Sequence, residues 1–295
     1  MKRATLIINP VAGKLRFKGA MFEIAQRLCD ADYDLTVKMT KTKGDAIELA
    51  SDLREDSCDV VICAGGDGTL NEVICGIMRS GADIPIGYIP CGSTNDFAQS
   101  MNLSINPIAA CEQIIKGEAK PFDIGMFAGK RNFSYIASFG AFTETSYTTP
   151  QQMKNALGHF AYVLESIKSL GNIKPYNVTT VADGKVVSGE YIFGAVANST
   201  SIAGVLKLKA DEVDMNDGKF EVILAKTPKN AQDLNELIGA VITANLSSPM
   251  LTYFKASKVE IRSCDKITWT LDGEQMDGAD KIIVENIPNR IKLIR

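Results

Sequence analysis

The sequence predicts an α/β protein of two domains: an N-terminal three-layer α/β nucleotide-binding domain with a mainly parallel sheet, and a C-terminal antiparallel β-sandwich domain. Two observations predict this. Short apolar, β-branched runs alternate with amphipathic helical segments in the N-terminal part, as in parallel sheets covered on both faces. After about residue 122, short strand-like segments separated by turn signals dominate instead. We expect one domain over residues 1–122, a second over 123–280, and a strand over 281–295 that could return to either.

The N-terminal elements are expected in strict alternation. Apolar runs predict strands at residues 5–8, 34–39, 59–63 and 84–89. Apolar residues at helical spacing predict helices that begin near Gly19, at Asp45, directly after Thr69 and near Asp96, with a further helix over residues 105–116. Asp45 is of a residue type that caps helix N-termini.

The C-terminal elements are expected to be mostly short strands. They are predicted at residues 122–127, 132–139, 177–181, 186–187, 191–197, 220–224, 259–262, 267–271 and 281–294. Two helices interrupt them, at residues 159–170 and 231–244. Asp183 and Gly184 together form a strong hairpin-turn signal.

Charge and composition argue against several classes of protein. The net charge of −3 argues against a general nucleic-acid-binding protein, so no nucleic-acid partner is expected. The seven cysteines include no CxxC pair and predict reduced thiols in a cytoplasmic protein. His159 is the only histidine and lacks the partners of a catalytic triad or a zinc site. No apolar run is long enough to span a bilayer, so any membrane contact is expected to be peripheral.

The most informative segment is the turn formed by Gly65, Gly66, Asp67, Gly68 and Thr69. It joins a buried apolar run to a helix N-terminus, where exposed N–H groups and the helix dipole attract phosphate. An acid inside such a turn repels phosphate, so Asp67 indicates a metal-assisted phosphate site rather than a passive one. The alternative is a tight turn whose glycines merely allow positive φ.

Three further loops follow predicted strands of the same sheet: residues 9–14, 40–45 and 92–96. Each alone is compatible with an ordinary turn or a solvated charged loop. Neither a Walker A motif nor a GxGxxG fingerprint is present. Because ligands of open α/β sheets bind at the carboxyl ends of strands, we expect all four loops to meet at one site.

Two C-terminal turns carry acids. The segment 211–218 contains hard oxygen ligands that suit Mg²⁺ or Ca²⁺, and it is equally compatible with a polar turn before a strand. The segment 270–274 reads by spacing as a hairpin tip. Apolar segments at residues 139–142 and 246–254 are candidates either for membrane-contacting loops or for the core.

Taken together, four segments resemble the bacterial diacylglycerol kinase family of lipid kinases, whose relatives include sphingosine and ceramide kinases and, more distantly, NAD kinase. The segments are NPVAGK at residues 9–14, GGDGTLNEV at 65–73, PCGSTNDFA at 90–98 and LDGE at 271–274. GGDGT alone is shared with NAD kinase and phosphofructokinases, whereas the ordered combination over nearly the whole chain is far more specific.

The resemblance implies an ATP site, a proton acceptor and a Mg²⁺ requirement. It makes Glu274 the base for a lipid hydroxyl and places Asp67 and Asp96 in a water–Mg²⁺ network. It implies a structural Mg²⁺ site at Asp217, with Asp214 and Lys219 contributing carbonyls. The family often has Asp-Asp-Gly there, whereas Asn216 precedes Asp217 in this chain. The implied ATP contacts are Asn9, Pro10, Gly13, Thr40, Gly65, Gly66, Asp67, Gly68, Thr69, Leu70, Asn71, Glu72 and Thr94.

The expected function is therefore an ATP-dependent kinase that transfers the γ-phosphate to a membrane lipid hydroxyl, with diacylglycerol, giving phosphatidic acid, as the first candidate. Phosphoryl transfer needs positioning, charge neutralisation and a carboxylate that accepts the hydroxyl proton, which is Glu274 or, in its place, Asp67. Phosphatidylglycerol or a sphingoid base is an alternative acceptor. An NAD kinase-like enzyme and a non-catalytic nucleotide-binding regulator are alternative functions. A cytoplasmic protein that contacts the inner membrane face peripherally, and a homodimer, are expected.

Overall fold

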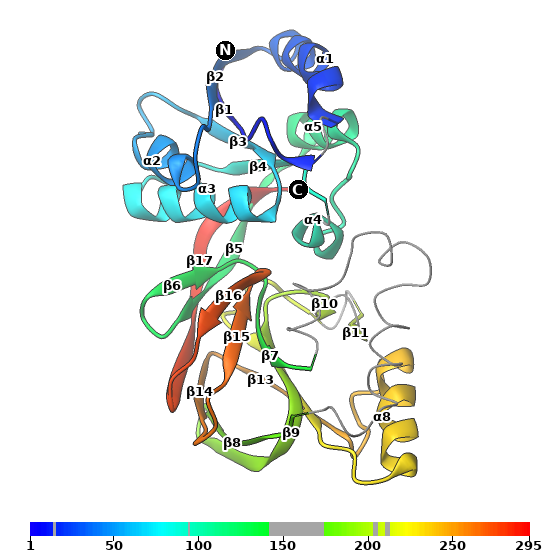
Figure 1. Ribbon diagram of the computed structural model, residues 1–295. Helices are drawn as coiled ribbons and strands as arrows, with labels where there is room; N and C mark the ends of the chain where they lie inside the picture. Colours follow the sequence, from blue (N-terminus) through cyan, green and yellow to red (C-terminus); the bar gives the residue numbers. More distant parts are fainter. Residues whose placement is uncertain (14–15, 94, 142–173, 203–205, 210–212) are drawn as a thin grey trace. The chain divides into compact units, whose positions relative to one another are not determined.

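Figure 1 shows the computed structural model, which describes residues 1–13, 16–93, 95–141, 174–202, 206–209 and 213–295. The chain divides into two compact units. The first unit comprises residues 1–124 and 288–295, and the second comprises residues 125–287. Each unit has its own apolar core and is described by itself.

The first unit is built on a parallel sheet. Its strands are β1 (Lys2–Ile8), β2 (Tyr33–Met39), β3 (Val60–Gly65) and β4 (Ile86–Pro90), in the spatial order β2-β1-β3-β4. The end of β17 (Lys281–Ile294) pairs in parallel with β4. The order reverses between β1 and β3, because the chain runs from β1 outward to β2 and then returns to β3. The prediction of a mainly parallel N-terminal sheet is confirmed.

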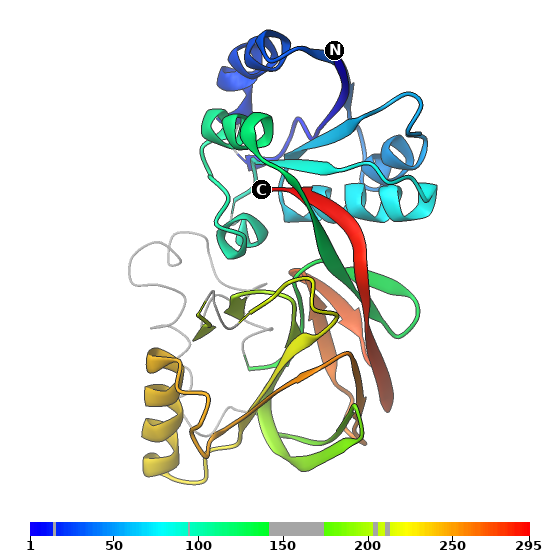
Figure 2. The ribbon, with the colours of Figure 1, turned by 180° about the vertical axis from the view of Figure 1, so that it is seen from behind.

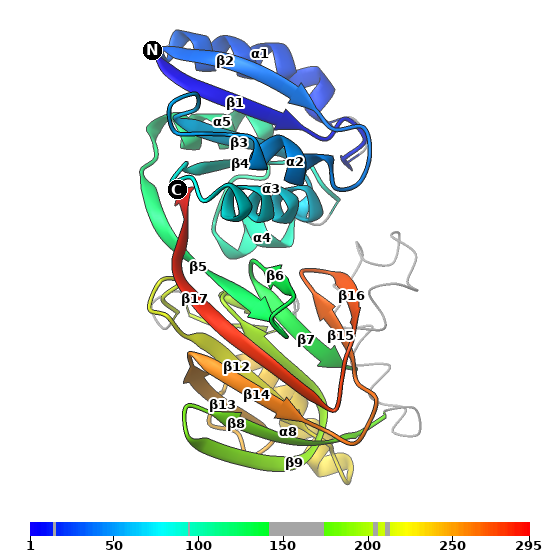
Figure 3. The same cartoon turned by 90° about the vertical axis from the view of Figure 1, so that its left-hand side faces the viewer.

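Helices cover both faces of this sheet, which explains why every residue of β3 and β4 is buried. Helices α2 (Asp45–Ser51) and α3 (Asp67–Ser80) pack together on one face, and α1 (Arg16–Asp30) and α5 (Pro107–Lys116) pack on the other (Figure 3). The short helix α4 (Asp96–Ser100) follows β4. At Asp45 the prediction of a helix cap is wrong: Gly44 occupies the cap, and the Asp45 carboxylate accepts the N–H groups of Lys41 and Thr42 in the preceding loop.

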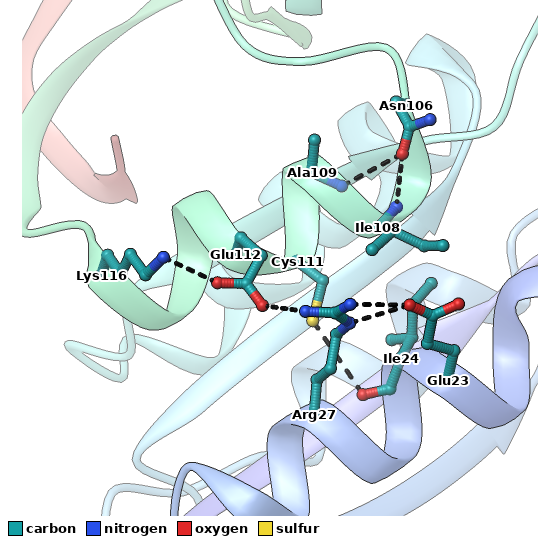
Figure 4. A network of polar contacts seen from close by, with 9 residues as sticks. All are labelled: Glu23, Ile24, Arg27, Asn106, Ile108, Ala109, Cys111, Glu112 and Lys116. Atoms are coloured by element: carbon teal, nitrogen blue, oxygen red, sulfur yellow. Dashed lines mark hydrogen bonds and ion pairs between the residues drawn. The ribbon is translucent and has the colours of Figure 1, made fainter.

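Helices α1 and α5 are joined by a polar network above their apolar contact (Figure 4). Arg27 of α1 donates to Glu23 on its own helix at 2.7 Å and to Glu112 of α5 at 2.5 Å. Lys116 pairs with the second oxygen of Glu112 at 2.9 Å. The Asn106 side chain accepts the first free N–H groups of α5 and so caps it. The network fixes how the two helices lie along each other.

Two long strands connect the units. Strand β5 (Ala119–Phe127) leaves the first unit and pairs with β17, which returns to it (Figure 2). The buried Asp123 of β5 accepts the N–H of Asn289 of β17 at 2.7 Å. The last predicted strand therefore belongs to both units, because residues 281–287 lie in the second and residues 288–294 in the first.

The second unit is antiparallel, as predicted. Its main path runs β16-β15-β7-β9-β8-β14-β17, while β12 pairs with β9 and β13, and β6 pairs with β5. The side chains of Phe127, Phe133, Phe139, Phe220 and Trp269 form the centre of its core. Its elements are β6 (Arg131–Phe133), β7 (Ile136–Gly140), β8 (Tyr176–Ala182), β9 (Lys185–Ala197), β10 (Ser201–Ile202), β11 (Leu206–Lys207), β12 (Phe220–Lys226), α8 (Ala231–Thr243), β13 (Leu251–Ala256), β14 (Lys258–Arg262), β15 (Thr268–Leu271) and β16 (Glu274–Asp277).

Two strand predictions in this unit are wrong. Residues 132–139 form two strands, β6 and β7, because the N–H groups of Ser134, Tyr135 and Ile136 donate to the Asp272 carboxylate instead of to a ladder. Residues 186–187 and 191–197 belong to one strand, β9, which continues through Gly189. The hairpin turn at Asp183 and Gly184 is confirmed, with φ of 44° and 87°. The helix expected over residues 159–170 lies outside the described residues.

The apolar segments considered for membrane contact are partly settled by burial. Phe139 is fully buried, and Met250 and Leu251 are also in the interior. These three side chains are core residues, and Phe142 lies outside the described part of the chain. Among the residues that the structure describes, no helix combines the length and apolar composition needed to cross a bilayer.

Candidate active site

Three loops of the first unit touch one another backbone against backbone. Gly13, in the loop after β1, has φ of 47°, and a Cβ atom there would stand 1.7 Å from the carbonyl oxygen of Cys91 after β4. A Cβ atom on Gly92 would stand 2.7 Å from the Cα of Gly66 after β3. Residue 13 must be glycine because of both its φ and its contact. The glycines of these loops therefore serve close packing.

The contact lies where the strand order reverses, at the carboxyl ends of β1 and β3. In open α/β sheets this is the place where ligands bind. Helix α3 begins there, and its N-cap residue Gly66 makes no side-chain capping bond. Uncapped N–H groups and the positive end of a helix dipole attract anions. The edge is therefore suited to a phosphate group.

Side chains link the loop after β1 to α3. Asn9 donates from Nδ2 to the Thr69 hydroxyl at 3.0 Å, and its Oδ1 accepts the Val11 N–H at 3.1 Å. The Thr69 side chain packs directly over Gly65, where a Cβ atom would stand 2.6 Å from the Thr69 Cβ. Asn9 thus holds the loop against the first turn of α3.

Asp67 faces the start of the next helix. Its Oδ2 accepts the Asp96 N–H at 3.0 Å and its Oδ1 accepts the Phe97 N–H at 3.2 Å. The Tyr88 hydroxyl lies 3.4 Å from Oδ1, and burial together with this carboxylate raises the pKa of Tyr88. Asp67 therefore has a structural role as the acceptor for the first N–H groups of α4. This explains how an acid is accommodated in a turn that otherwise favours anions.

The loop after β2 reaches the same edge. Thr40 is buried, and its N–H donates to the Ile8 carbonyl at 2.9 Å. Gly44 donates its N–H to the Glu72 carboxylate of α3 at 3.0 Å. The structure thus brings all four loops to the edge where the sequence analysis expected them to meet.

The remaining residues predicted to contact ATP differ in how far their side chains are exposed to solvent. Leu70 is fully buried and its N–H donates to the Gly66 carbonyl, so its side chain belongs to the core. Gly68 and the Asp96 side chain are exposed, and Pro10 and Asn71 are half-buried. Thr94 and Lys14 lie outside the described residues.

Asn95 shapes the loop after β4 and was not among the predicted site residues. Asn95 is buried with φ of 52°, its Oδ1 accepts the Gly92 N–H at 2.7 Å, and its Nδ2 donates to the Gly92 carbonyl at 3.1 Å. Asparagine tolerates this left-handed backbone better than most residues. Its place directly after the Gly-Ser-Thr segment was the available signal.

In the second unit, Glu274 begins β16 directly after the hairpin turn at Asp272 and Gly273. The Glu274 carboxylate forms an ion pair with Arg131 of β6. Asp272 is buried and accepts bonds from the Ser134 N–H at 2.5 Å, the Ser134 hydroxyl at 2.7 Å, and the N–H groups of Tyr135 and Ile136 at 3.0 Å. Burial raises the pKa of Asp272, and these hydrogen bonds oppose the rise. The hairpin tip predicted from spacing is confirmed, but neither Arg131 nor the role of Asp272 was foreseen.

The predicted structural metal site lies in the turn before β12. Asp217 accepts the Lys219 N–H at 2.9 Å, and Asp214 accepts the Asn216 N–H at 3.2 Å. The second Asp217 oxygen lies 3.9 Å from the ammonium of Lys255, which also pairs with the buried Glu221. Within the described ranges, no group of three or more His, Cys, Asp or Glu side chains could hold a metal.

One carboxylate with backbone carbonyls is nevertheless a hard-oxygen ligand set that fits Mg²⁺ or Ca²⁺. Lys255 offsets part of the negative charge that would attract such a cation.

These observations define a class of protein: a doubly wound α/β unit with a glycine-rich edge where its strand order reverses, joined to an antiparallel β unit. The chain matches the family model described as diacylglycerol kinase catalytic domain over residues 3–127. It matches the model described as YegS C-terminal NAD kinase beta sandwich-like domain over residues 139–295.

Curated relatives and solved structures agree with these matches. The chain is 34% identical to a diacylglycerol kinase of Bacillus subtilis (strain 168), covering 93% of this chain and 90% of that protein. It is 34% identical to a diacylglycerol kinase of Staphylococcus carnosus (strain TM300), covering 92% and 89%. Two crystal structures of proteins from Bacillus anthracis str. Sterne match with TM-scores of 0.82 and 0.77, identities of 23% and 22%, and coverage of 99% of this chain and 95% and 96% of theirs. The chain belongs to the diacylglycerol kinase family of lipid kinases.

Proposed function

We propose that this protein transfers the γ-phosphate of ATP to the free hydroxyl of diacylglycerol, giving phosphatidic acid and ADP. The proposal assigns the nucleotide to residues 1–122 and the lipid to residues 123–280. The observation that carries it is the convergence of four strand-terminal loops at the switch point of the first unit, in a chain of the diacylglycerol kinase family.

The geometry of the first unit supports phosphate binding. The N-terminus of α3, whose N-cap residue is Gly66, directs backbone N–H groups and the positive end of the helix dipole to the edge where the glycine loops meet, which favours a phosphate group there. The ATP contacts of the proposal are those implied by the resemblance, Asn9 to Gly13, Thr40, residues 65–72 and Thr94. Of these, Asn9, Thr69 and Glu72 fix the loops by hydrogen bonds, from Asn9 to Thr69 and from Gly44 to Glu72.

Mg²⁺ accompanies ATP in this proposal. Asp67 and Asp96 are neighbours at the edge, since the Asp96 N–H donates to the Asp67 carboxylate, and they are the residues that would hold the ion through water. When bound, Mg²⁺ would neutralise charge on the transferring phosphoryl group. The structural Mg²⁺ at Asp217, with the carbonyls of Asp214 and Lys219, is a separate part of the proposal.

Glu274 is the proton acceptor of the proposal. A lipid alcohol has a very high pKa, so a carboxylate that accepts its proton while the new O–P bond forms lowers the barrier. Glu274 is partly exposed, with 34% of its side-chain surface accessible, so it can reach an external hydroxyl. Asp67 is a weaker candidate for this role, because it accepts the N–H groups of Asp96 and Phe97.

The test measures phosphate transfer from γ-labelled ATP to lipid. Glu274→Gln is expected to lower turnover by about 100-fold or more, the range that general-base groups contribute, while the affinity for ATP is retained. Wild-type turnover in this variant would remove Glu274 as the base. Offering diacylglycerol, phosphatidylglycerol, a sphingoid base and NAD in parallel identifies the acceptor, and no transfer to any of them would favour a regulatory nucleotide-binding protein.

The lipid substrate also implies where the protein acts. Diacylglycerol resides in a bilayer, so the proposal includes peripheral contact with the cytoplasmic face of the inner membrane. A homodimer is carried over from the resemblance, and the chemistry does not require it.

A further inference from the structure

Glu274 stands on the apolar face of an edge strand. Strand β16 is the first strand of the sheet path, and its register pairs Glu274 with Leu271 and Met276 with Trp269. Antiparallel partners project from the same face, so Glu274 shares a face with two buried apolar side chains. A carboxylate in such surroundings loses hydration, and its ionised form needs a partner.

Arg131 is that partner. Its Nη2 donates to Glu274 Oε2, and its Nη1 lies 3.4 Å from the Met276 sulfur. Arg131 is paired with Phe127 across the β5–β6 hairpin, and the Phe127 ring packs against Trp269 with centroids 5.1 Å apart. The arginine stem therefore follows an ordered apolar surface, and its guanidinium reaches two side chains of β16.

A second, independent link fixes β6 relative to β16. Asp272, two residues before Glu274, accepts four hydrogen bonds from Ser134, Tyr135 and Ile136, the segment that directly follows β6. The positions of Arg131 and Glu274 are thus set by buried backbone contacts. Exposed ion pairs without such support contribute little to stability. The two residues of this pair are instead held at fixed positions by the hairpin.

We propose that Arg131 is a positioning residue that holds the Glu274 carboxylate in the correct orientation for proton transfer, an inference that rests on the proposed function. As the lipid oxygen forms its bond to the γ-phosphorus, the bond from that phosphorus to the ADP oxygen breaks, and the hydroxyl proton passes to Glu274. In this role Arg131 acts through Glu274 and not on the reacting atoms. Its guanidinium places a positive charge beside the carboxylate and fixes the plane of that carboxylate.

The experiment compares Arg131→Met, which keeps the apolar stem, with Arg131→Lys, which keeps the charge. Arg262→Met is the matched control, because Arg262 pairs with Glu260 on β14 of the same unit. In diacylglycerol micelles, Arg131→Met is expected to lower kcat by about 10–100-fold, a part of what the base itself contributes. The KM for ATP and the melting temperature are expected to stay near wild type, Arg131→Lys to recover part of the lost kcat, and Arg262→Met to leave kcat unchanged.

The double variant Arg131→Met with Glu274→Gln separates the two claims. If Arg131 acts through Glu274, the double variant turns over as slowly as Glu274→Gln alone, because the effects of coupled residues are not additive. Wild-type kcat in Arg131→Met, or the same further loss in the Glu274→Gln background, would overturn the positioning role and leave the proposed function standing. Wild-type turnover in Glu274→Gln would instead remove the base assignment on which the inference rests.

Discussion

The edge where the four loops of the first unit meet and the Glu274 hairpin of the second unit are held in different ways. At the edge, backbone meets backbone, since Gly13 abuts Cys91 and Gly92 abuts Gly66. At the hairpin, side chains make the long-range contacts, through Asp272 and Arg131. Close glycine contacts therefore make an edge sensitive to any added atom, whereas a side-chain link makes a hairpin sensitive to any atom removed.

The largest expected effect tests the side-chain link. Asp272→Ala removes the acceptor of three backbone N–H groups and one hydroxyl in the core. Each buried donor left unpaired costs about 1–3 kcal/mol, and removal of the buried carboxylate offsets part of this by removing its desolvation cost. We therefore expect the free energy of unfolding to fall by about 3–5 kcal/mol in all. Chemical denaturation monitored by Trp269 fluorescence measures it.

Asp265→Ala is the matched control, because the Asp265 carboxylate accepts a hydrogen bond from a single exposed donor, the Asn177 N–H. Its effect should be well below that of Asp272→Ala. Equal losses in the two variants would show that the hairpin does not depend on Asp272, and the comparison would fail.

A Cβ atom added at Gly13 tests the edge at which the loops pack backbone against backbone. Gly13→Ala places a Cβ inside the Cys91 carbonyl and in a left-handed conformation. Overpacking of this kind costs about 1–3 kcal/mol, which corresponds to about a 10–100-fold loss of ATP affinity if it distorts the site. Calorimetric titration with ATP measures it.

Gly19→Ala is the control, because a Cβ at that helical position meets no atom within 4 Å. Unchanged ATP affinity in Gly13→Ala would show that nucleotide binding does not depend on the glycine contacts.

The smallest change in stability is expected at the turn that contains Asp217, where backbone carbonyls and one carboxylate would together bind a cation. Added Mg²⁺ is expected to raise the melting temperature slightly in the absence of ATP, and Asp217→Asn to abolish the rise. Because Lys255 already lies near this carboxylate, the shift should be modest. A shift that persists in Asp217→Asn would place the ion elsewhere.

The sequence predicted the edge better than the hairpin, for a physical reason. Glycine turns after apolar strands are local signals, and strand order then brings them together. The break between β6 and β7 depends on Asp272, which is 138 residues away from Ser134. Arg131 and Glu274 are 143 residues apart, and no local pattern marks the arginine. Contacts of that length are decided by tertiary structure.

Contacts beyond the local sequence also explain two smaller errors of prediction, at Asp45 and near Gly189. Asp45 is of a residue type that caps helices. Its carboxylate instead accepts hydrogen bonds from the N–H groups of the preceding loop. Gly189 resembles an interruption between two strands, but β9 runs through it because β8 pairs along its length. At both positions loop or long-range contacts overrode local propensity.

The path of β17 has a consequence for how the chain assembles during translation. The strand beside β4 is made of residues 288–294, which leave the ribosome after the whole second unit. Until then the β4 edge of the nascent first unit lacks that partner, and its closure pairs Leu293 with Ile86, 207 residues earlier in the chain. Such non-local pairing is slow, so we expect this edge to be the last part of the first unit to mature.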